Sequence, residues 1–534
     1  MALKKHALAL ALASASIAPH AHSQTEATAA EQIAAAQANA QASAAQTYAV
    51  TIALIQELVN AGVLPLEKAQ QMIDHAEKQA TLARQAQAQA QPQPATVRVP
   101  YVSETTKKQL RDELRKEVAE QARQERWGAP GALPDWLSRI DIGGDFRVRW
   151  QGDYFDSGNF PYVPDVQAIN DAGGVTTANG FPFVNTTDDR QRFRYRARLN
   201  LGAKVTDGVK VNLSLASGED NGPISTNKTF GDYLRKDSIW LDRAYIEIKP
   251  YDGIGVAAGR MPNPFFSTDL VWDPDLNFEG AAVSGNYPLG FAKSSLFGTL
   301  GMFPLQERAR YANRWLRAGQ LGAIAALGAV NVKLGAAYYD FDGVQSKKNP
   351  PDGSRLNDYS KPPLLAQGNS VFNMRTDGLT TLAGLASEFR LADIVAQAEY
   401  EFAADRIVRV TADYVRNLAM DRDEIDALRG EPGVKPGDTG WQLRLFVGHP
   451  KIAKLHDWSF DVGYKRLETD AVVDAFTDSD FGAYGGTDLK GYTLEGNYGV
   501  ADNTWVTLRW LSADAIARPP FSTDVLQLDL NTRF

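Results

Sequence analysis

Two hydrophobic periods divide the chain near residue 135. Before that point, apolar positions recur every three to four residues, as in residues 52–59, which is typical of helices. After Pro134 the period changes to two and stays there to the end of the chain. In residues 140–150, for example, apolar side chains share one face, while Asp and Arg side chains share the other. The pattern predicts a short helical segment followed by a long series of half-buried strands.

The alternating pattern recurs along the whole second part of the chain. It lies in residues 140–150, 190–204, 208–217, 237–249, 252–260, 277–287, 292–303, 315–326, 329–341, 391–402, 406–417, 439–448, 457–466, 487–500, 504–514 and 523–534. Short connections such as 206–207 and 501–502 alternate with long polar ones such as 154–189 and 343–376. Short turns on one side and long loops on the other are typical of a transmembrane antiparallel β-barrel, which we predict over 136–534.

Residues 377–402 decide the number of strands. Taken alone, these residues contain two alternating runs, and counting both as strands would make the total number of barrel strands odd. A bacterial barrel with both ends on one side of the membrane needs an even number, so we assign one crossing to 391–402 and a loop extension to 377–390. The expected barrel has about sixteen strands. A soluble sandwich or propeller is the alternative, but aromatic side chains near strand ends, such as Trp240 and Trp510, favour the barrel.

The first residues have the order of a secretory signal peptide. Lys4 and Lys5 form a basic start, residues 7–18 are apolar, and small residues allow cleavage after Ser23. The apolar run is too short to span a bilayer as a helix. An internal Ala-rich helix is the alternative. We expect removal of residues 1–23 and export of the remaining chain.

Residues 24–135 are rich in Ala and Gln and predict a small helical segment with a linker. In a helix expected over 104–125, apolar residues including Leu110, Leu114 and Val118 repeat every four residues. This stripe is either a coiled-coil seam or the narrow apolar face of a solvated helix, because a seam requires a 3.5-residue period over three or more heptads. We place the segment in the periplasm, ahead of the barrel.

Composition removes several classes of function. The chain has no cysteine, which excludes disulfides, thiolate metal sites and a cysteine nucleophile. Its formal net charge of −8 argues against a nucleic-acid partner. Gly253, Gly255 and Gly259 resemble part of a dinucleotide loop, but no helix follows them. Asp421 and Asp423 lack the spacing of a calcium-binding loop. We therefore expect no cofactor, no metal ion and no catalytic residue.

Six short motifs add a family resemblance. They are Trp136–Ile140, Leu241–Ile246, Gly259–Phe266, Asp273–Gly280, Ala412–Asn417 and Val472–Phe481. The last strand, with Leu526, Leu528 and Leu530 on one face, ends in Phe534, and this ending resembles the assembly signature of outer-membrane proteins. Together the motifs resemble the proteobacterial putative porin family with an N-terminal helical extension, over nearly all of Val99–Phe534. The resemblance implies a trimeric diffusion pore of roughly sixteen strands.

Seven arginines are the main candidates for functional residues. They are Arg147 and Arg149 on one expected strand, and Arg190, Arg192, Arg194, Arg196 and Arg198 on the next. Residues two apart on a strand point to one face, about 6.7 Å from each other. The opposite face is apolar and must meet lipid, where an arginine costs about 2–4 kcal/mol near the midplane, so the arginines must line the lumen.

Two interpretations of these arginines stay open at this point. In the first they form an electropositive wall that attracts anions. In the second they belong to a packing network with acidic residues of the lumen. The acidic candidates are Asp141, Asp145, Glu247, Glu399 and Glu401.

An acidic connection is expected after Arg260. The run Met261-Pro262-Asn263-Pro264 cannot continue a strand. Folded inward, the following loop would face the arginines and place a transverse field across the narrowest part of a pore; otherwise it is an ordinary external loop. The family resemblance favours the inward position. The acidic residues concerned are Asp269, Asp273, Asp275 and Glu279.

The sequence therefore predicts an outer-membrane porin for passive diffusion of small hydrophilic solutes, with a preference for anionic or zwitterionic ones. Expected partners are outer-membrane lipid and lipopolysaccharide, the diffusing solutes, and further copies of the chain in a homotrimer. A non-conducting adhesin or structural barrel is the alternative. A barrel enzyme would lack a histidine base, because beyond residues 1–23 only His75, His449 and His456 occur. An active transporter would need a compact plug domain in place of 24–135.

Overall fold

The computed structural model describes residues 139–534 apart from 177, 179, 220–221, 292 and 431–435. The expected signal peptide and the expected helical segment, with its 104–125 helix, lie outside the described residues. Within the described part, no helix has the length and apolar character needed to cross a membrane.

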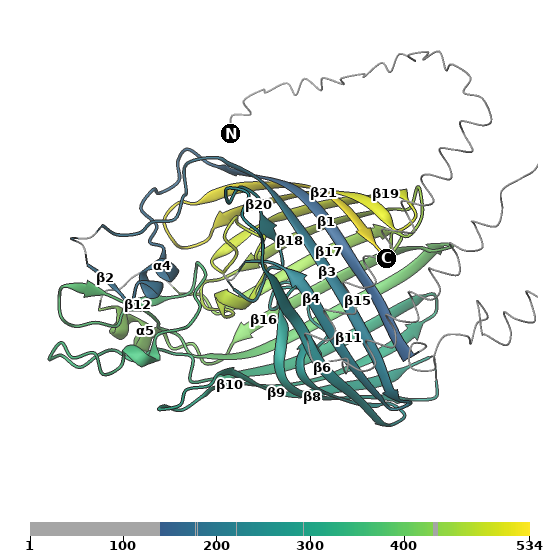
Figure 1. The fold of residues 1–534 in the computed structure, drawn as a ribbon. Coiled ribbons are helices and arrows are strands. Elements are labelled where there is room, and N and C mark those ends of the chain that lie inside the picture. Colours follow the sequence, from purple (N-terminus) through teal and green to yellow (C-terminus); the bar gives the residue numbers. More distant parts are fainter. Residues whose placement is uncertain (1–138, 177, 179, 220–221, 292, 431–435) are drawn as a thin grey trace, which may run out of the picture. The chain divides into compact units, whose positions relative to one another are not determined.

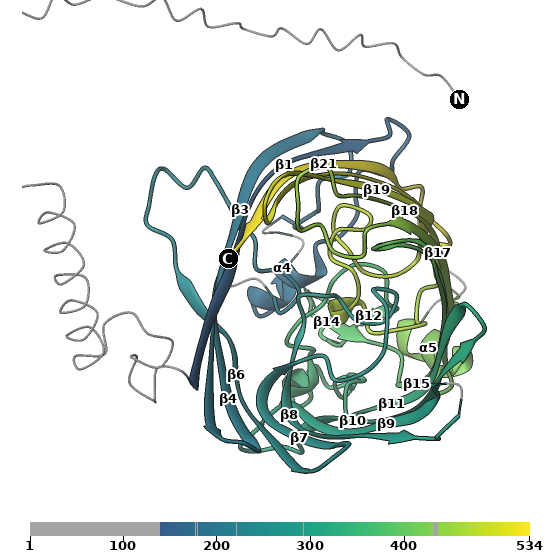
Figure 2. The same ribbon diagram turned by 90° about the vertical axis from the view of Figure 1, so that its right-hand side faces the viewer.

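Sixteen long strands form one closed antiparallel sheet, as Figures 1 and 2 show. They are β1 (Ile140–Phe155), β3 (Arg190–Thr206), β4 (Val209–Ser217), β6 (Ile239–Tyr251), β7 (Ile254–Pro262), β8 (Asn277–Pro288), β9 (Ser295–Gln306), β10 (Arg314–Leu327), β11 (Val330–Asp342), β15 (Phe389–Ala403), β16 (Arg406–Asn417), β17 (Thr439–Gly448), β18 (Trp458–Leu467), β19 (Leu489–Ala501), β20 (Thr504–Ala515) and β21 (Ser522–Arg533). Each pairs with the next, and β21 pairs back to β1. Closure lets the wall satisfy its backbone groups within the sheet, as a lipid surrounding requires.

The prediction of about sixteen strands is confirmed, and residues 377–402 contribute one crossing, β15. The rest of that region belongs to a long loop. Its short strands β13 (Thr380–Thr381) and β14 (Ala383–Leu385) pair with β2 (Val175–Thr176) and β12 (Val371–Asn373), outside the barrel sheet. Strands of two or three residues give no measurable period, so the sequence pattern did not reveal them.

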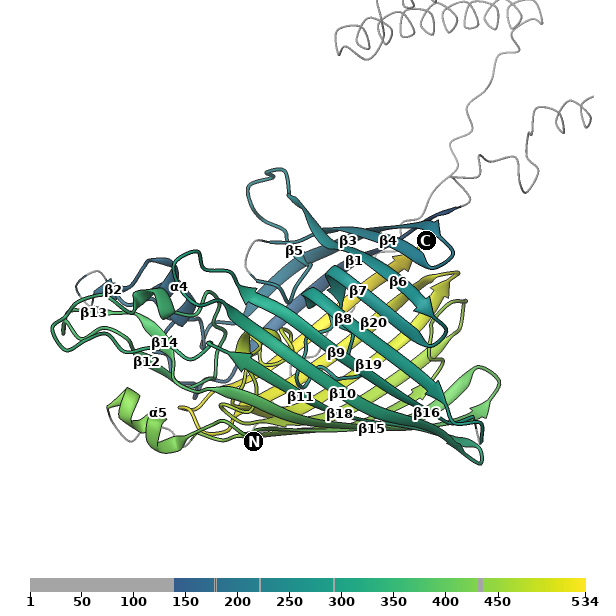
Figure 3. The same ribbon diagram turned by 90° about the horizontal axis from the view of Figure 1, so that it is seen from below.

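Short turns and long loops lie at opposite ends of the barrel (Figure 3). The loop end carries the elements that are not part of the barrel crossings. Besides β2 and β12–β14 they are α4 (Val166–Asp171), α5 (Arg422–Arg429), η3 (Asp358–Ser360), η4 (Asp474–Phe476) and β5 (Lys228–Thr229). In such barrels the long loops face the cell exterior, which places the short turns at the periplasmic end.

Alternation along each strand separates an apolar outer face from a polar inner face. Large apolar side chains such as Phe193, Leu300 and Leu321 are exposed on the outside. Trp441, Tyr464 and Tyr492 also face outward on neighbouring strands, with ring centroids 5.2 and 4.9 Å apart. Such aromatic belts mark the level of the lipid headgroups.

Two loops fold back into the barrel, where Figure 2 shows them inside the ring of strands. The first, residues 263–276, connects β7 to β8, and the second, residues 468–488, connects β18 to β19. The first loop is held by apolar packing: Phe265 and Trp272 are buried against Tyr339, at centroid distances of 5.3 and 5.2 Å. The inner face of β8–β11 contributes several apolar side chains to this cluster, so burying the aromatic rings there removes apolar surface from water. We call 263–276 the first inward loop and 468–488 the second inward loop.

Candidate solute pathway

The structure places all seven candidate arginines on the inner face of β1 and β3. Arg147 lies directly opposite Arg196, and Arg149 lies opposite Arg194. Like charges opposite one another across two strands repel, so this part of the wall needs carboxylates nearby.

Most of these arginines have such a partner. Arg149, which is buried, donates to Asp529 over 2.8 Å and to Asp480 over 3.0 Å. Arg198 donates to Asp145 over 2.8 Å. Further ion pairs join Arg192 to Asp153 (3.0 Å), Arg196 to Asp145 (3.0 Å) and Arg147 to Asp529 (3.8 Å).

The acidic partners differ from those the sequence offered. Among the described residues, Asp145 is the only one of the five candidates that pairs with any of the seven arginines, and it pairs with both Arg196 and Arg198. Asp141 pairs with Lys210, and Glu399 pairs with Arg409. The sequence pattern gives the face of a strand residue but says nothing of which side chain reaches it across the lumen. For that reason it missed Asp480 and Asp529.

Arg190 and Arg194 differ from the other five arginines. Among the described residues, neither guanidinium has a carboxylate within 4.0 Å. Arg194 donates instead to neutral oxygens, to Gln151 over 3.4 Å and to Ser225 over 3.5 Å. These two side chains therefore have no direct ion pair among the described residues, although the charge of Asp480 also acts on Arg194.

The first inward loop reaches both sides of the barrel interior. Near the end of the loop that leads into β8, Asp275 pairs with Arg198 of β3 over 3.3 Å. Asp269 pairs with Arg444 of β17 over 3.1 Å and with Lys465 of β18 over 3.6 Å. The loop is thus tied by charge to two separate parts of the wall.

Glu279 does not join the other acidic residues of this connection. It belongs to β8, is exposed on the outer face and pairs with Arg260 of β7 over 2.7 Å. The residue before it, Phe278, points inward against Phe265, so the two-residue period sends Glu279 outward.

The second inward loop brings further carboxylates to the wall. Asp480 lies between Arg149 (3.0 Å) and Arg509 (3.3 Å), and Asp478 pairs with Lys465 over 3.0 Å. Burial alone would raise the pKa of Asp480, but the charges of Arg149 and Arg509 outweigh it and hold the pKa well below its usual value. No periodic pattern in the sequence indicated that this loop folds inward, although 472–481 is one of the family motifs.

Asp273 joins the two inward loops. Its backbone N–H donates to the carbonyl of Phe476 over 2.8 Å, and its carboxyl accepts the N–H of Ser479 over 2.8 Å. Burial, together with the neighbouring carboxylates of Asp478 and Asp275, raises the pKa of Asp273 to about 8. The junction is therefore built around a carboxyl that is mostly protonated at neutral pH.

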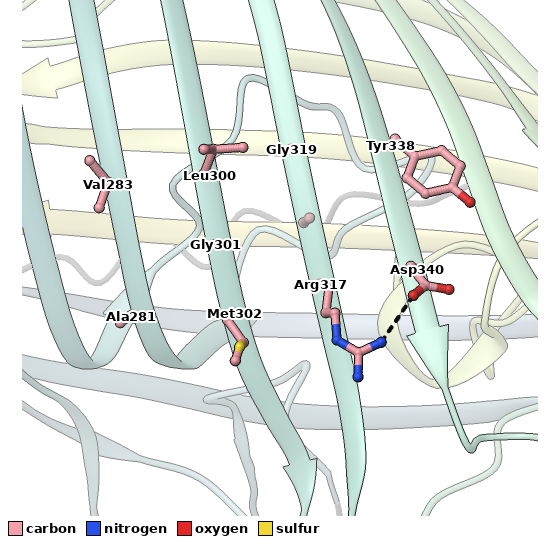
Figure 4. A pocket seen from close by; sticks show the side chains of 10 residues that line it. Ala281, Val283, Leu300, Gly301, Met302, Arg317, Gly319, Tyr338 and Asp340 are labelled. Carbon is pink, nitrogen blue, oxygen red and sulfur yellow. Dashed lines mark hydrogen bonds and ion pairs between the residues drawn. The ribbon is translucent and has the colours of Figure 1, made fainter.

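A separate hollow lies on the outer wall. It has a volume of about 500 Å³ and is lined by side chains of β8–β11, among them Leu300, Met302 and Tyr338, as Figure 4 shows. One polar pair lies at its edge, where Arg317 faces Asp340 over 3.4 Å. Because these side chains alternate with the inward ones, the hollow faces away from the lumen and lies off the solute pathway.

The geometry is that of a membrane barrel with a charged interior, and a family model agrees with it. The model described as "Putative porin" matches residues 46–534. The chain belongs to the putative porin family. This membership supports an outer-membrane porin, as the motifs in the sequence implied. No curated protein matches the chain.

Solved structures similar to this porin are distant in sequence. Pseudomonas putida OprB is 12% identical, covers 76% of this chain and 96% of its own, and has a TM-score of 0.44. Vibrio cholerae OmpT, in a trimer form, is 11% identical over 74% of this chain and 99% of its own, with a TM-score of 0.39. The channel DcaP of Acinetobacter baumannii is 13% identical over 74% and 97%, with a TM-score of 0.37. At these values the likenesses do not indicate what passes through the porin.

Asp273 should make the junction of the inward loops sensitive to pH. Because the pKa of Asp273 is raised in the folded protein, the folded junction keeps a proton on this carboxyl up to a higher pH. The unfolded chain releases that proton near the usual pKa of Asp. The free energy of unfolding of the junction therefore falls as the pH rises from the usual pKa of Asp towards 8, and it is lowest above pH 8. We expect single-channel current fluctuations to increase between about pH 6 and about pH 9 as the loops loosen.

Asp273→Asn cannot ionise and should make the fluctuations independent of pH over this range. Glu279→Gln is the matched control, because that carboxylate lies on the outer wall, and it should retain the wild-type response. If Asp273→Asn and the wild type respond to pH equally, Asp273 does not govern the junction.

Proposed function

We propose that this porin conducts small hydrophilic solutes by passive diffusion and prefers anions. The observation that carries the proposal is the position of Arg190 and Arg194, which face the lumen without a carboxylate partner among the described residues. Charge at the wall of a narrow, water-filled passage with low-dielectric surroundings acts on passing ions at short range.

The acidic loops do not offset this preference. Asp269, Asp275 and Asp480 each pair with an arginine of the wall, so their fields largely cancel those of their partners at short distance. Acidic residues elsewhere on the chain, which contribute to the net charge of −8, are screened by salt within about 8–10 Å. The two arginines without acidic partners are therefore expected to determine the sign of the selectivity.

Conductance of the full chain in a planar lipid bilayer tests the diffusion function. We expect large stepwise increases in KCl current as single channels insert, because a diffusion pore is open to water. The competing function is a non-conducting adhesin or structural barrel. Insertion of folded protein without current steps would favour that alternative.

Selectivity is tested by the zero-current potential in a KCl gradient. Arg194→Gln removes a positive charge without an acidic partner, and Arg196→Gln leaves Asp145 and Asp275 with less compensation. Each variant should shift the potential towards cation selectivity, and the double variant should shift it further. Arg317→Gln, on the outer wall, is the matched control and should not change it. An unchanged potential in the double variant would show that these residues do not control permeation.

We also propose that the porin is a homotrimer in contact with outer-membrane lipid and lipopolysaccharide, with residues 24–135 in the periplasm. The support is the family resemblance together with the apolar stripe expected in 104–125. Chemical cross-linking should yield trimers from the full chain. Fewer trimers from a chain that starts at Trp136 would assign trimerisation to the helical segment. Monomers from both would contradict the proposal.

A further inference from the structure

A chamber of about 520 Å³ lies beside the first inward loop, towards the short-turn end of the barrel. Arg409, one of its lining residues, lies close to the start of β16, which follows a short turn. On one side the chamber is lined by aromatic rings of the loop, including Phe266 and Trp272, and on the other by arginines of the wall, including Arg444. It thus has one side rich in aromatic rings, the apolar side, and one rich in guanidinium groups, the cationic side. Asp269, Asp273 and Asp461 also line it.

On the cationic side, the guanidinium of Arg444 is more exposed than the two carboxylates that pair with it. The side chain of Arg444 is 25% exposed, whereas those of its partners Asp269 and Asp461 are only 9% and 12% exposed. A solute beside Arg444 therefore has more of the guanidinium than of these two carboxylates to contact. This arrangement favours an anionic group over a cationic one.

Arg409 has a donor available for such a group. Its Nε and Nη2 both donate to Oε2 of Glu399, over 2.8 and 2.7 Å. Its third nitrogen, Nη1, has no hydrogen-bond partner among the described residues. Glu399 therefore holds the guanidinium in place while leaving one edge open.

The apolar side is preformed. On the wall, Phe446 of β17 adds a ring next to the cationic side, with its centroid 5.4 Å from the guanidinium carbon of Arg409. Trp272 is held in place by Phe278 at 4.9 Å and by Tyr339 at 5.2 Å. Trp272 itself is buried, so a flat apolar group can contact the half-buried rings of Phe266 and Phe446 without the wall having to rearrange.

We propose that this chamber binds small organic anions that carry a planar apolar group, such as aryl carboxylates, on their way through the pore. The carboxylate accepts hydrogen bonds from Arg409 and Arg444, and the planar group packs against the aromatic side. The volume is within the range of known small-molecule sites, about 300–1,000 Å³. This inference rests on the proposed porin function, because the solute reaches the chamber through the lumen.

Block of single-channel KCl current by added solutes tests the chamber in the full-length porin. Benzoate should reduce the current saturably. Acetate, which has the charge without the ring, and benzyl alcohol, which has the ring without the charge, should each need a concentration about tenfold higher or more. Equal block by benzoate and acetate would overturn the proposal.

Variants separate binding from folding. Arg409→Gln and Phe446→Leu should each raise the half-blocking concentration of benzoate, the first by about tenfold, as expected for loss of a charge-assisted hydrogen bond. Glu399→Gln should lower it, because this change frees the guanidinium of Arg409. Opposite changes from two partners of one ion pair cannot come from a shared folding defect.

Matched controls lie on the outer wall. Arg317→Gln and Phe460→Leu make the same chemical changes away from the lumen and should leave the block unchanged. If benzoate blocks Arg409→Gln as strongly as it blocks the wild type, the proposed binding chamber is overturned. Current steps in KCl from the same protein would still support the pore. Absence of any current steps in KCl would overturn the pore itself, and the chamber with it.

Discussion

The interior of this barrel depends on the compensation of buried arginines by carboxylates that two loops bring into the lumen. A buried guanidinium without a partner is strongly destabilising, by about 3–5 kcal/mol when one partner is removed. Arg149, among the most buried of the group, is satisfied by Asp529 of the neighbouring strand and by Asp480 of the second inward loop. The charged wall therefore requires the loops to fold inward. The apolar side chains on the inner face of β8–β11 make that position favourable for the first loop as well.

The same constraint limits the number of residues that we propose to determine selectivity. Ion pairs fix the loops and the wall in one arrangement and largely cancel their own fields, so they shape the passage more than they select solutes. Arg190 and Arg194 are the members of the group without a carboxylate partner among the described residues. The chamber follows a similar principle, since Glu399 orients Arg409 and leaves one donor free. Selectivity in this account comes from the donors that remain after structural pairing.

The sequence predicted the fold well because strand alternation is a local property. Alternation located the sixteen crossings, and the even-number rule assigned 377–402 to one strand, β15. Alternation also implied that the arginines face inward. It could not identify Asp480 as a partner of Arg149, because that contact joins residues far apart in the chain through a loop without a period. Glu279 shows the reverse case: its place within the acidic motif suggested an inward position, but the period of β8 turns it outward.

The absence of cysteine from the sequence allows the central claim, that the arginine face of β3 borders the water-filled path, to be tested directly. Arg194→Cys and Leu321→Cys place single thiols on the inner wall and on the exposed outer wall, respectively. The measurement is single-channel conductance before and after addition of a bulky, water-soluble, thiol-specific reagent. We expect a stepwise fall in conductance at position 194 and no change at position 321. Modification at position 194 that leaves the conductance unchanged would contradict it.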